Sequence, residues 1–400
     1  MSAKDSTVEN WAEDWDILDP AWVDDPYPIW EELRGRCPVA HTPRFNEGTW
    51  LPVRFDDLAT IAHDTATFSN NHDGLTAGGT SPRDRLPPIT SDPPEHSAMR
   101  RAVLPFFAPR RIEDWRAAIE AHCTELAEAV AARGHGDAAV DYAQHIPVGA
   151  IAAILGVDPA DGDQFRTWIH DFAEVGARKP EVRIRANADI GKYMLAEIAK
   201  RRRQPSDDLI SHLTQTEVDG QPLDDDTIRR MLLLQLLAGI DTTWSSIGAA
   251  LWHLAANPLD RQRLVDEPEL IPTAVEELLR AYAPVSVVRR VTGDVEVAGA
   301  EMHAGDSVLM AFPAACRDPE VFEQADEVVI DRQRNRHAAF GLGIHRCLGS
   351  NLARLEMITA VGTWLHHIPE FELAPGANVT WSAGQIRGPR TIPIVIGSSR

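Results

Sequence analysis

The strongest constraint on this chain is a single cysteine, Cys347, set in the glycine-rich run of residues 340–349 and followed at once by a long apolar, helix-forming segment. Glycines allow the backbone to curl closely around a sulfur atom and to point N–H groups at it. The N-terminus of the following helix favours the anionic thiolate. A thiolate ligand pushes electron density onto haem iron and promotes O–O cleavage. The run therefore predicts that Cys347 is a thiolate metal ligand.

Three other interpretations of the run fit the residues less well. A lone intracellular cysteine is most often a buried structural thiol, but such a thiol needs no glycine framework. The glycines do not form a dinucleotide-binding loop, because Arg346 stands where the third glycine would be. A zinc site is disfavoured because His345 and Cys347 have no second ligand pair at finger spacing.

The run resembles the haem-binding loop of the bacterial cytochrome P450 family, Phe-x-x-Gly-x-His/Arg-x-Cys-x-Gly, at every fixed position. The resemblance implies that the chain binds haem b (iron protoporphyrin IX). It also implies a mainly α-helical fold with small β-sheets, the P450 fold, with residues 1–400 forming a single haem domain. Within this loop, the resemblance assigns contacts with the cofactor to Phe340, Gly341, His345, Cys347 and Gly349.

The periodicity of apolar residues along the chain agrees with a mainly helical fold. Helical patterns predict helices at 29–34, 56–64, 94–107, 110–133, 144–156, 160–176, 182–203, 225–257 and 348–366. Alternating patterns predict strands only in the first fifth and the last third, at 49–54, within 287–312 and at 391–396. A long Gly/Pro/Ser-rich loop at 69–91 and the region near 165–185 are expected to control access to the site.

The apolar helical segment from Met231 to Trp244 contains an acid and an alcohol side by side, Asp241 and Thr242. Polar groups in such a helix are costly unless they are satisfied. Thr242 can donate to the carbonyl of Ala238 one turn back and open room beside the helix. One interpretation is a kink with an exposed acidic cap. The segment also resembles the family's oxygen-activation signature, which implies that Asp241 relays protons inward and Thr242 hydrogen-bonds the iron-bound dioxygen or its water.

Charged residues elsewhere match two further family patterns. Glu277 and Arg280 stand at i and i+3 on one helical face, and they resemble the buried pair that braces the haem-binding core, with Arg336 expected to join them. The resemblance also assigns four cations to the two haem propionates. They are His96 and Arg100, which share one helical face, Arg289, for which Arg290 is a competing candidate, and His345.

The resemblance also assigns a set of pocket walls, which are Leu234, Ala238, Val285, Val287 and Ile386. All are apolar, which favours an apolar substrate, although core packing selects the same residue types. The chain departs from the family before Arg317-Asp-Pro319, where Cys316 replaces the usual asparagine. We expect that change to affect local packing and not function.

Composition excludes some partners. The net charge of −21 argues against nucleic-acid binding, and the run 200–203 is better explained as the basic end of a helix. The polar N-terminus has no apolar core for a signal peptide or membrane anchor, and the four cysteines are scattered, as in a reducing compartment. We expect a cytoplasmic monomer without membrane attachment.

Phrases at 238–248, 335–340 and 379–390 are most similar to haem domains fused to a phthalate-dioxygenase-type reductase. This chain stops ten residues after Arg390, so a separate NAD(P)H-driven ferredoxin and ferredoxin reductase are implied as electron donors. We expect the donor to dock on the Cys347 face through Arg110, Arg111, Arg332, Arg334 and Arg346.

The implied activity is a monooxygenase that inserts one atom of O2 into a C–H bond of a small, largely apolar substrate, giving hydroxylation or O-, N- or S-dealkylation. Two alternatives stay open. A peroxide-driven haem–thiolate peroxygenase would not need the Asp241–Thr242 pair. A haem-based sensor or binding protein would respond to ligands without forming an oxidised product.

Overall fold

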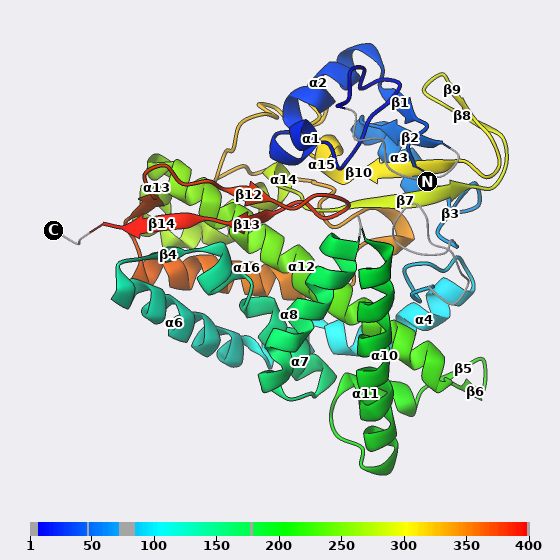
Figure 1. The fold of residues 1–400 in the computed structure, drawn as a ribbon, viewed down its shortest axis with the longest axis horizontal. Helices are drawn as coiled ribbons and strands as arrows, with labels where there is room; N and C mark the ends of the chain where they lie inside the picture. The colour runs from blue at the N-terminus through cyan, green and yellow to red at the C-terminus, as the bar shows by residue number, and fades with distance from the viewer. Residues whose placement is uncertain (1–6, 46–47, 72–84, 177–178, 398–400) are drawn as a thin grey trace.

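The computed structural model describes residues 7–45, 48–71, 85–176 and 179–397. Its architecture is mainly helical with small sheets, as predicted (Figure 1). The α-helices are α1 (Pro20–Asp24), α2 (Tyr27–Arg36), α3 (Phe55–His63), α4 (Glu95–Val103), α5 (Pro109–Glu113), α6 (Arg116–Arg133), α7 (Ile146–Leu155), α8 (Gly162–His170), α10 (Pro180–Arg203), α11 (Leu209–Thr214), α12 (Asp225–Ala256), α13 (Pro258–Asp266), α14 (Ile271–Ala281), α15 (Phe312–Ala315) and α16 (Ser350–His367).

The strands form one larger sheet and several small ones. The five-stranded sheet has the order β1 (Val39–Thr42), β2 (Thr49–Pro52), β10 (Ser307–Ala311), β7 (Ser286–Val291) and β3 (Phe68–Ser69), and only the β2–β10 pairing in it is parallel. The others are β11 (Phe371–Leu373), β14 (Pro393–Ile396) and β4 (His135–Asp137), then β12 (Thr380–Trp381) with β13 (Pro389–Thr391), β5 (Glu217–Val218) with β6 (Gln221–Pro222), and β8 (Val295–Val297) with β9 (Ala300–Met302).

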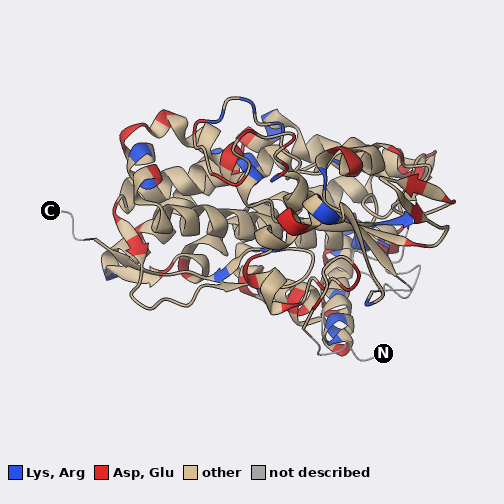
Figure 2. Ribbon diagram, turned by 90° about the horizontal axis from the view of Figure 1, so that it is seen from above, with Lys and Arg blue, Asp and Glu red and all other residues tan. Residues whose placement is uncertain are grey.

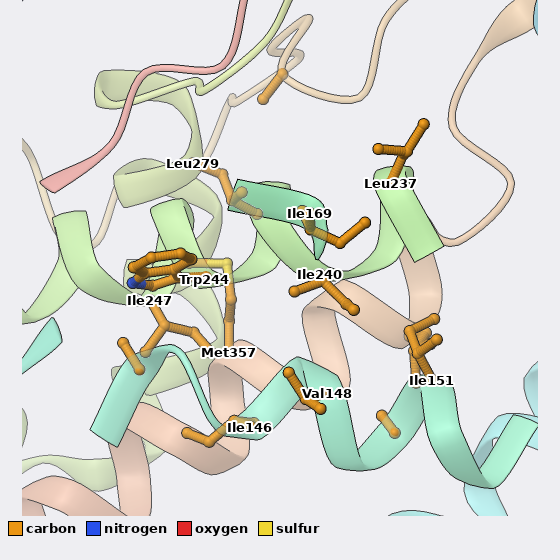
Figure 3. Packing of buried hydrophobic residues seen from close by; sticks show 14 of the residues in the cluster. Ile146, Val148, Ile151, Ile169, Leu237, Ile240, Trp244, Ile247, Leu279 and Met357 are labelled. Atoms are coloured by element: carbon orange, nitrogen blue, oxygen red, sulfur yellow. The ribbon is translucent and has the colours of Figure 1, made fainter. Parts of the chain in front are cut away.

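Helix α12 is the central element of the helical part. Asp224 caps it by accepting a hydrogen bond from the backbone N–H of Thr227 (2.9 Å). Most of its residues are buried around the whole circumference, the pattern of a core helix and not of an amphipathic surface helix. Figure 3 shows Ile240 and Ile247 of α12 packed above Ile146 and Val148 near α7, with Met357 of α16 beside them.

A second apolar cluster joins the N-terminal segment to the larger sheet. Trp15, Trp22, Trp30 and Leu33 are buried together against strand residues such as Leu309. The Trp22 and Trp30 rings meet edge to face at 5.7 Å, an arrangement favoured by their quadrupoles. This cluster fixes the N-terminal segment against the sheet that forms one wall of the site.

Most predicted elements are present, but the prediction that strands occur only at the two ends of the chain was wrong. β4 forms because it pairs with the distant β14, and its own sequence carries no strand pattern. β5 and β6 form a hairpin across Asp219-Gly220, a turn signal that was available in the sequence. The segment 160–176 is α8 followed by a π-helical segment, Asp171–Val175.

Most of the predicted 69–91 loop, residues 72–84, lies outside the described residues. Within the described parts of the chain, no helix is both long enough and apolar enough to cross a membrane. Charged residues lie mainly on the outer helices and loops (Figure 2).

Candidate active site

A cavity of about 630 Å³ lies between the Cys347 loop and α12, and it is closed by segments from the whole length of the chain. Residues of the predicted haem loop line one side, and Ala238, Asp241 and Thr242 of α12 line another. Ala238 is exposed although the α12 residues before it are buried, because it faces this cavity. The structure thus brings the predicted metal ligand and the predicted acid–alcohol pair to one space.

The Cys347 loop is held by its backbone. The N–H of Cys347 donates to the carbonyl of Phe340 (2.7 Å), which closes the run into a tight loop. Gly343 has a φ of +68°, and a Cβ atom there would collide with the Ala62 carbonyl of α3. Glycine is therefore required at this position both for its conformation and for its contact.

The Cys347 side chain is exposed, and the space that it faces is the cavity. Burial within the protein raises the pKa of its thiol, and this effect outweighs the backbone N–H of Gly349 and the cations Arg100 and Arg346, which lower it. A sulfur next to donors and cations is the setting in which a metal-bound thiolate is stabilised.

The predicted propionate residues gather at the same cavity. The rings of His96 of α4 and His345 are in contact, tilted at 54° with centroids 4.2 Å apart, and both residues line the cavity with Arg100 and Arg289. Arg100 donates to the carbonyl of Arg346 (2.7 Å), which ties α4 to the Cys347 loop. Burial lowers the pKa of His96, and Arg100 acts in the same direction.

The two candidate arginines, Arg289 and Arg290, differ in burial. Arg290 is exposed, whereas Arg289 is 4% exposed and lines the cavity. Arg289 donates to the carbonyl of Val288 (2.9 Å), and desolvation lowers its pKa to about 10 despite the opposing charge of Asp92. A buried guanidinium in this state lacks a full anionic partner.

These residues fit the predicted haem. Both ring nitrogens of His96 are buried without a hydrogen-bond partner, and Arg289, which lines the same cavity, is desolvated. Two propionates would supply the missing acceptors and the missing negative charge. The sulfur of Cys347 faces the same cavity, so the set contains a metal ligand and propionate partners.

The acid–alcohol pair is arranged partly as predicted. The Thr242 hydroxyl donates to the carbonyl of Ala238 (2.6 Å), which is the expected bond. The interpretation of Asp241 as an exposed cap was wrong, because its side chain is buried and 4% exposed. α12 also continues without interruption through both residues.

Asp241 has a partner that the sequence analysis missed. Arg390 of β13 donates from Nη2 to Asp241 Oδ1 (2.7 Å) and from Nε to Glu174 Oε2 (2.8 Å). It also donates to the hydroxyl of Ser245 (3.2 Å) and covers the Trp244 ring at 4.3 Å. The sequence shows that an arginine, Arg390, lies in the last strand-forming part of the chain. Its pairing with Asp241 could not be predicted from local spacing, because the two residues are 149 positions apart.

The predicted pair of Glu277 and Arg280 is present, with two hydrogen bonds of 2.8 Å and no exposure of either side chain. The third member is Arg332 (2.9 Å) and not Arg336, so that prediction was wrong. Cys316 belongs to the same region, because its carbonyl accepts from Arg280 (2.9 Å) and its sulfur accepts from the N–H of Ala338 (3.3 Å). The departure at Cys316 is thus a matter of packing.

All the predicted pocket walls line the cavity, and Val285 and Ile386 pair in an isolated antiparallel bridge. The sequence analysis missed the polar residues Arg183, Asn187, Arg229 and Gln235, which line the cavity on α10 and α12. Arg183 also covers the Phe172 ring at 4.6 Å, in the predicted access region.

The predicted docking arginines are not equivalent. Arg110, Arg334 and Arg346 are exposed. Arg111 is half-buried and pairs with Asp207 (3.0 Å). Arg332 is 9% exposed and is bound by Glu277, which removes it from any docking surface.

Comparison with known proteins identifies relatives over most of the chain. The family model described as "Cytochrome P450" matches residues 179–271 and 260–380. Mycinamicin IV hydroxylase/epoxidase of Micromonospora griseorubida is 34% identical over 377 residues, covering 91% of this chain and 94% of that one. Steroid C26-monooxygenase of Mycobacterium tuberculosis is 34% identical over 333 residues, covering 81% of this chain and 90% of that one.

Solved structures agree with these relatives. A mutant of the mixed-function P450 MycG in complex with mycinamicin IV has a TM-score of 0.81 at 33% identity, covering 92% of this chain and 95% of that one. The bacillaene polyketide synthase P450 PksS of Bacillus subtilis has a TM-score of 0.88 at 28% identity, covering 96% of this chain and all of that one.

Proposed function

This chain belongs to the cytochrome P450 family, and from that premise we propose that it oxidises a small, largely apolar molecule at a C–H bond, by hydroxylation or by O-, N- or S-dealkylation. The observation that carries the proposal is the single cavity that holds the Cys347 sulfur, Thr242 and apolar walls together. Its lining runs from Trp15 to Arg390, which supports one haem domain over the whole chain.

We propose that Cys347 ligates the iron of haem b and that four cations hold its propionates. These are His96, Arg100, Arg289 and His345, while Phe340, Gly341 and Gly349 shape the loop around the sulfur. When bound, the haem supplies the activation of O2 and the transfer of one oxygen atom to carbon.

The chain's own residues hold protons and exclude water. Thr242 presents its hydroxyl at the cavity while it donates to Ala238, and it can turn to donate inward. Asp241 is one residue away and buried, with an ion pair to Arg390. We propose that Asp241 gives up a proton toward Thr242 and that Thr242 holds it at the cavity wall.

The apolar walls orient the substrate. Leu234, Val285, Val287 and Ile386 offer only dispersion contacts, and a cavity of about 630 Å³ lies within the usual range for small-molecule sites. The named relatives act on mycinamicin IV and on steroids. We propose a mostly apolar substrate for this chain too, with Asn187 and Gln235 available to a few polar groups.

We propose that a separate NAD(P)H-driven ferredoxin system supplies electrons to a monomeric enzyme through the Cys347 face. Arg110, Arg334 and Arg346 supply exposed cations, and the exposed side chain of Ile344 (40%) lies within the Cys347 loop. An acidic ferredoxin would be attracted by the cations and would pack against the apolar side chain. Charge reversal at Arg346 should slow reduction and weaken its salt dependence, whereas Arg332 reversal should lower stability instead.

The experiment that tests the function has three steps. First, the reduced, haem-loaded protein is mixed with carbon monoxide and the spectrum of the adduct is recorded. Second, a separate sample of the oxidised, haem-loaded protein is screened against a library of apolar compounds for a low-to-high-spin shift of the Soret band. Third, compounds that bind are incubated with a surrogate ferredoxin, its reductase and NADPH, and the products are analysed. A carbonyl adduct without the red shift of thiolate coordination would overturn the proposal. Turnover with peroxide alone would instead identify a peroxygenase, and ligand-dependent spectra without any oxidised product would identify a sensor.

A further inference from the structure

A second pocket, of about 400 Å³, adjoins the main cavity, and Leu18, Glu174 and Ala383 line both. His170 of α8 also lines the second pocket, and its side chain is 47% exposed. His170 Nδ1 lies 3.6 Å from Glu174 Oε2. Glu174 therefore stands between a half-exposed histidine and the wall of the main cavity.

Arg390 joins Glu174 to Asp241. Its guanidinium donates to one carboxylate from Nε (2.8 Å) and to the other from Nη2 (2.7 Å), and its side chain is 11% exposed. The guanidinium carbon Cζ lies 4.3 Å from the centroid of the Trp244 ring, a cation–π contact that helps to hold the group in place. One buried cation is thus shared by two carboxylates.

A shared cation binds each carboxylate less firmly than it would bind one alone. The charged groups that act on Asp241 are Arg390 from β13, Glu174 from the π-helical segment and His170 from α8. Burial raises the pKa of Asp241; Arg390 and His170 oppose the rise, and Glu174 adds to it. Arginine remains protonated in proteins, so Arg390 holds the two acids and does not itself relay protons.

We propose that Glu174 is a positioning residue of the proton path. Glu174 competes with Asp241 for Arg390 from the side of the second pocket. This competition leaves Asp241 free to exchange its proton. This inference rests on the proposed role of Asp241. A proton that reaches Asp241 from solvent neutralises its carboxylate, and Arg390 then pairs with Glu174 alone. When Asp241 passes that proton toward Thr242 it becomes an anion again and regains its share of Arg390.

The first test is an infrared pH titration of the haem-loaded protein. The carboxylic-acid band of Asp241 is identified as the band lost in Asp241→Asn. In Glu174→Gln, Arg390 serves Asp241 alone, so the midpoint of that band should fall by about one pH unit, a tenfold change in proton affinity. Glu174→Asp keeps the charge and should largely restore the midpoint.

Two further variants complete the test. Glu113→Gln removes a carboxylate from an exposed pair with Arg116 and should leave the Asp241 band unchanged. His170→Gln removes a cation that competes for Glu174, so it should raise the midpoint slightly, and it serves if Glu174→Gln does not fold. An Asp241 midpoint that stays fixed in the Glu174 and His170 variants, or that moves equally in Glu113→Gln, would overturn the inference.

The hydrogen peroxide released per NADPH consumed is a second measurement, for which the inference predicts the direction of the change. With a surrogate ferredoxin and reductase, Glu174→Gln should release several-fold more hydrogen peroxide per NADPH than the parent protein, and more so at higher pH. The infrared midpoint depends on the ion pairs and not on turnover. The two measurements together therefore distinguish failure of this inference from failure of the proposed function. A normal midpoint shift without any oxygenated product would refute the proposed function, while normal oxygenation with no shift would refute the role of Glu174.

Discussion

Two buried ion clusters in this protein have opposite charge balance. Glu277 is surrounded by Arg280 and Arg332, with further hydrogen bonds from Asn335 (3.1 Å) and the N–H of Val329 (2.8 Å). At the second cluster one cation, Arg390, serves two carboxylates, and the group borders the cavity. The first cluster has two arginines for one carboxylate and is closed; the second has one arginine for two carboxylates, with the half-exposed His170 beside Glu174, and is open.

The difference separates a structural pair from a group that can exchange protons. Arg280 also donates to the carbonyls of Cys316, Ala325 and Glu327, so every partner in the first cluster is fixed by several bonds. Its hydrogen bonds lower the pKa of Glu277 despite burial. Burial raises the pKa of Asp241 instead; Arg390 opposes this rise, and the charge of Glu174 adds to it. A carboxylate that keeps its proton affinity is the one suited to proton transfer.

The largest effect should come from breaking the closed cluster. Glu277→Gln would leave Arg280 buried without a counter-charge, and we expect a loss of about 3–5 kcal/mol in the free energy of unfolding. Urea denaturation of the haem-loaded protein measures it. A loss below about 1 kcal/mol would mean that this cluster is no tighter than a surface pair.

Another buried carboxylate is Glu356 of α16. Among the described residues no cation acts on its pKa, which burial raises to about 8. Its folded-state pKa exceeds the ordinary value of 4.5, so the folded protein holds a proton that the unfolded chain releases between those two pH values. Stability should therefore fall as pH rises, by about 2.5 kcal/mol between pH 5 and pH 7. Denaturation at both pH values should show that Glu356→Gln abolishes this part of the slope; an unchanged slope would contradict the assignment.

At the open cluster we expect a change in chemistry and little change in stability. Thr242→Ala should keep the haem and the spectrum of the carbonyl adduct but raise the peroxide formed per NADPH about tenfold, which corresponds to about 1.4 kcal/mol in the partition between two steps. Peroxide and product are measured in the same reaction. Unaltered coupling would argue against proton transfer at this wall.

The smallest effect should come from an exposed pair of similar geometry. Arg36 and Glu32 lie 2.7 Å apart on α2, and both side chains are about half exposed. Because water screens this pair, Glu32→Gln should cost about 0.5 kcal/mol or less. Comparison with Glu277→Gln in the same denaturation series shows whether burial, and not distance, sets the strength of these pairs.

Local spacing was enough to predict several parts of the site. The bond from Thr242 to Ala238 and the pair of Glu277 with Arg280 follow from helical geometry, in which residues three and four apart are neighbours. The expectation that Arg336 joins this pair failed because its segment is irregular and has no periodicity from which contacts can be predicted. The hairpin at 217–222 was missed although its Asp-Gly turn was visible.

The sequence by itself determined the family, the mainly helical fold and the residues that are grouped within single segments, such as the Cys347 loop. Backbone geometry fixes those relations over a few residues, whatever the rest of the chain does. Only the tertiary structure decided that Arg390 meets Asp241 and Glu174, that Arg289 and not Arg290 faces the cavity, and that β4 exists. These contacts join segments far apart in sequence, and they depend on how whole helices and strands pack.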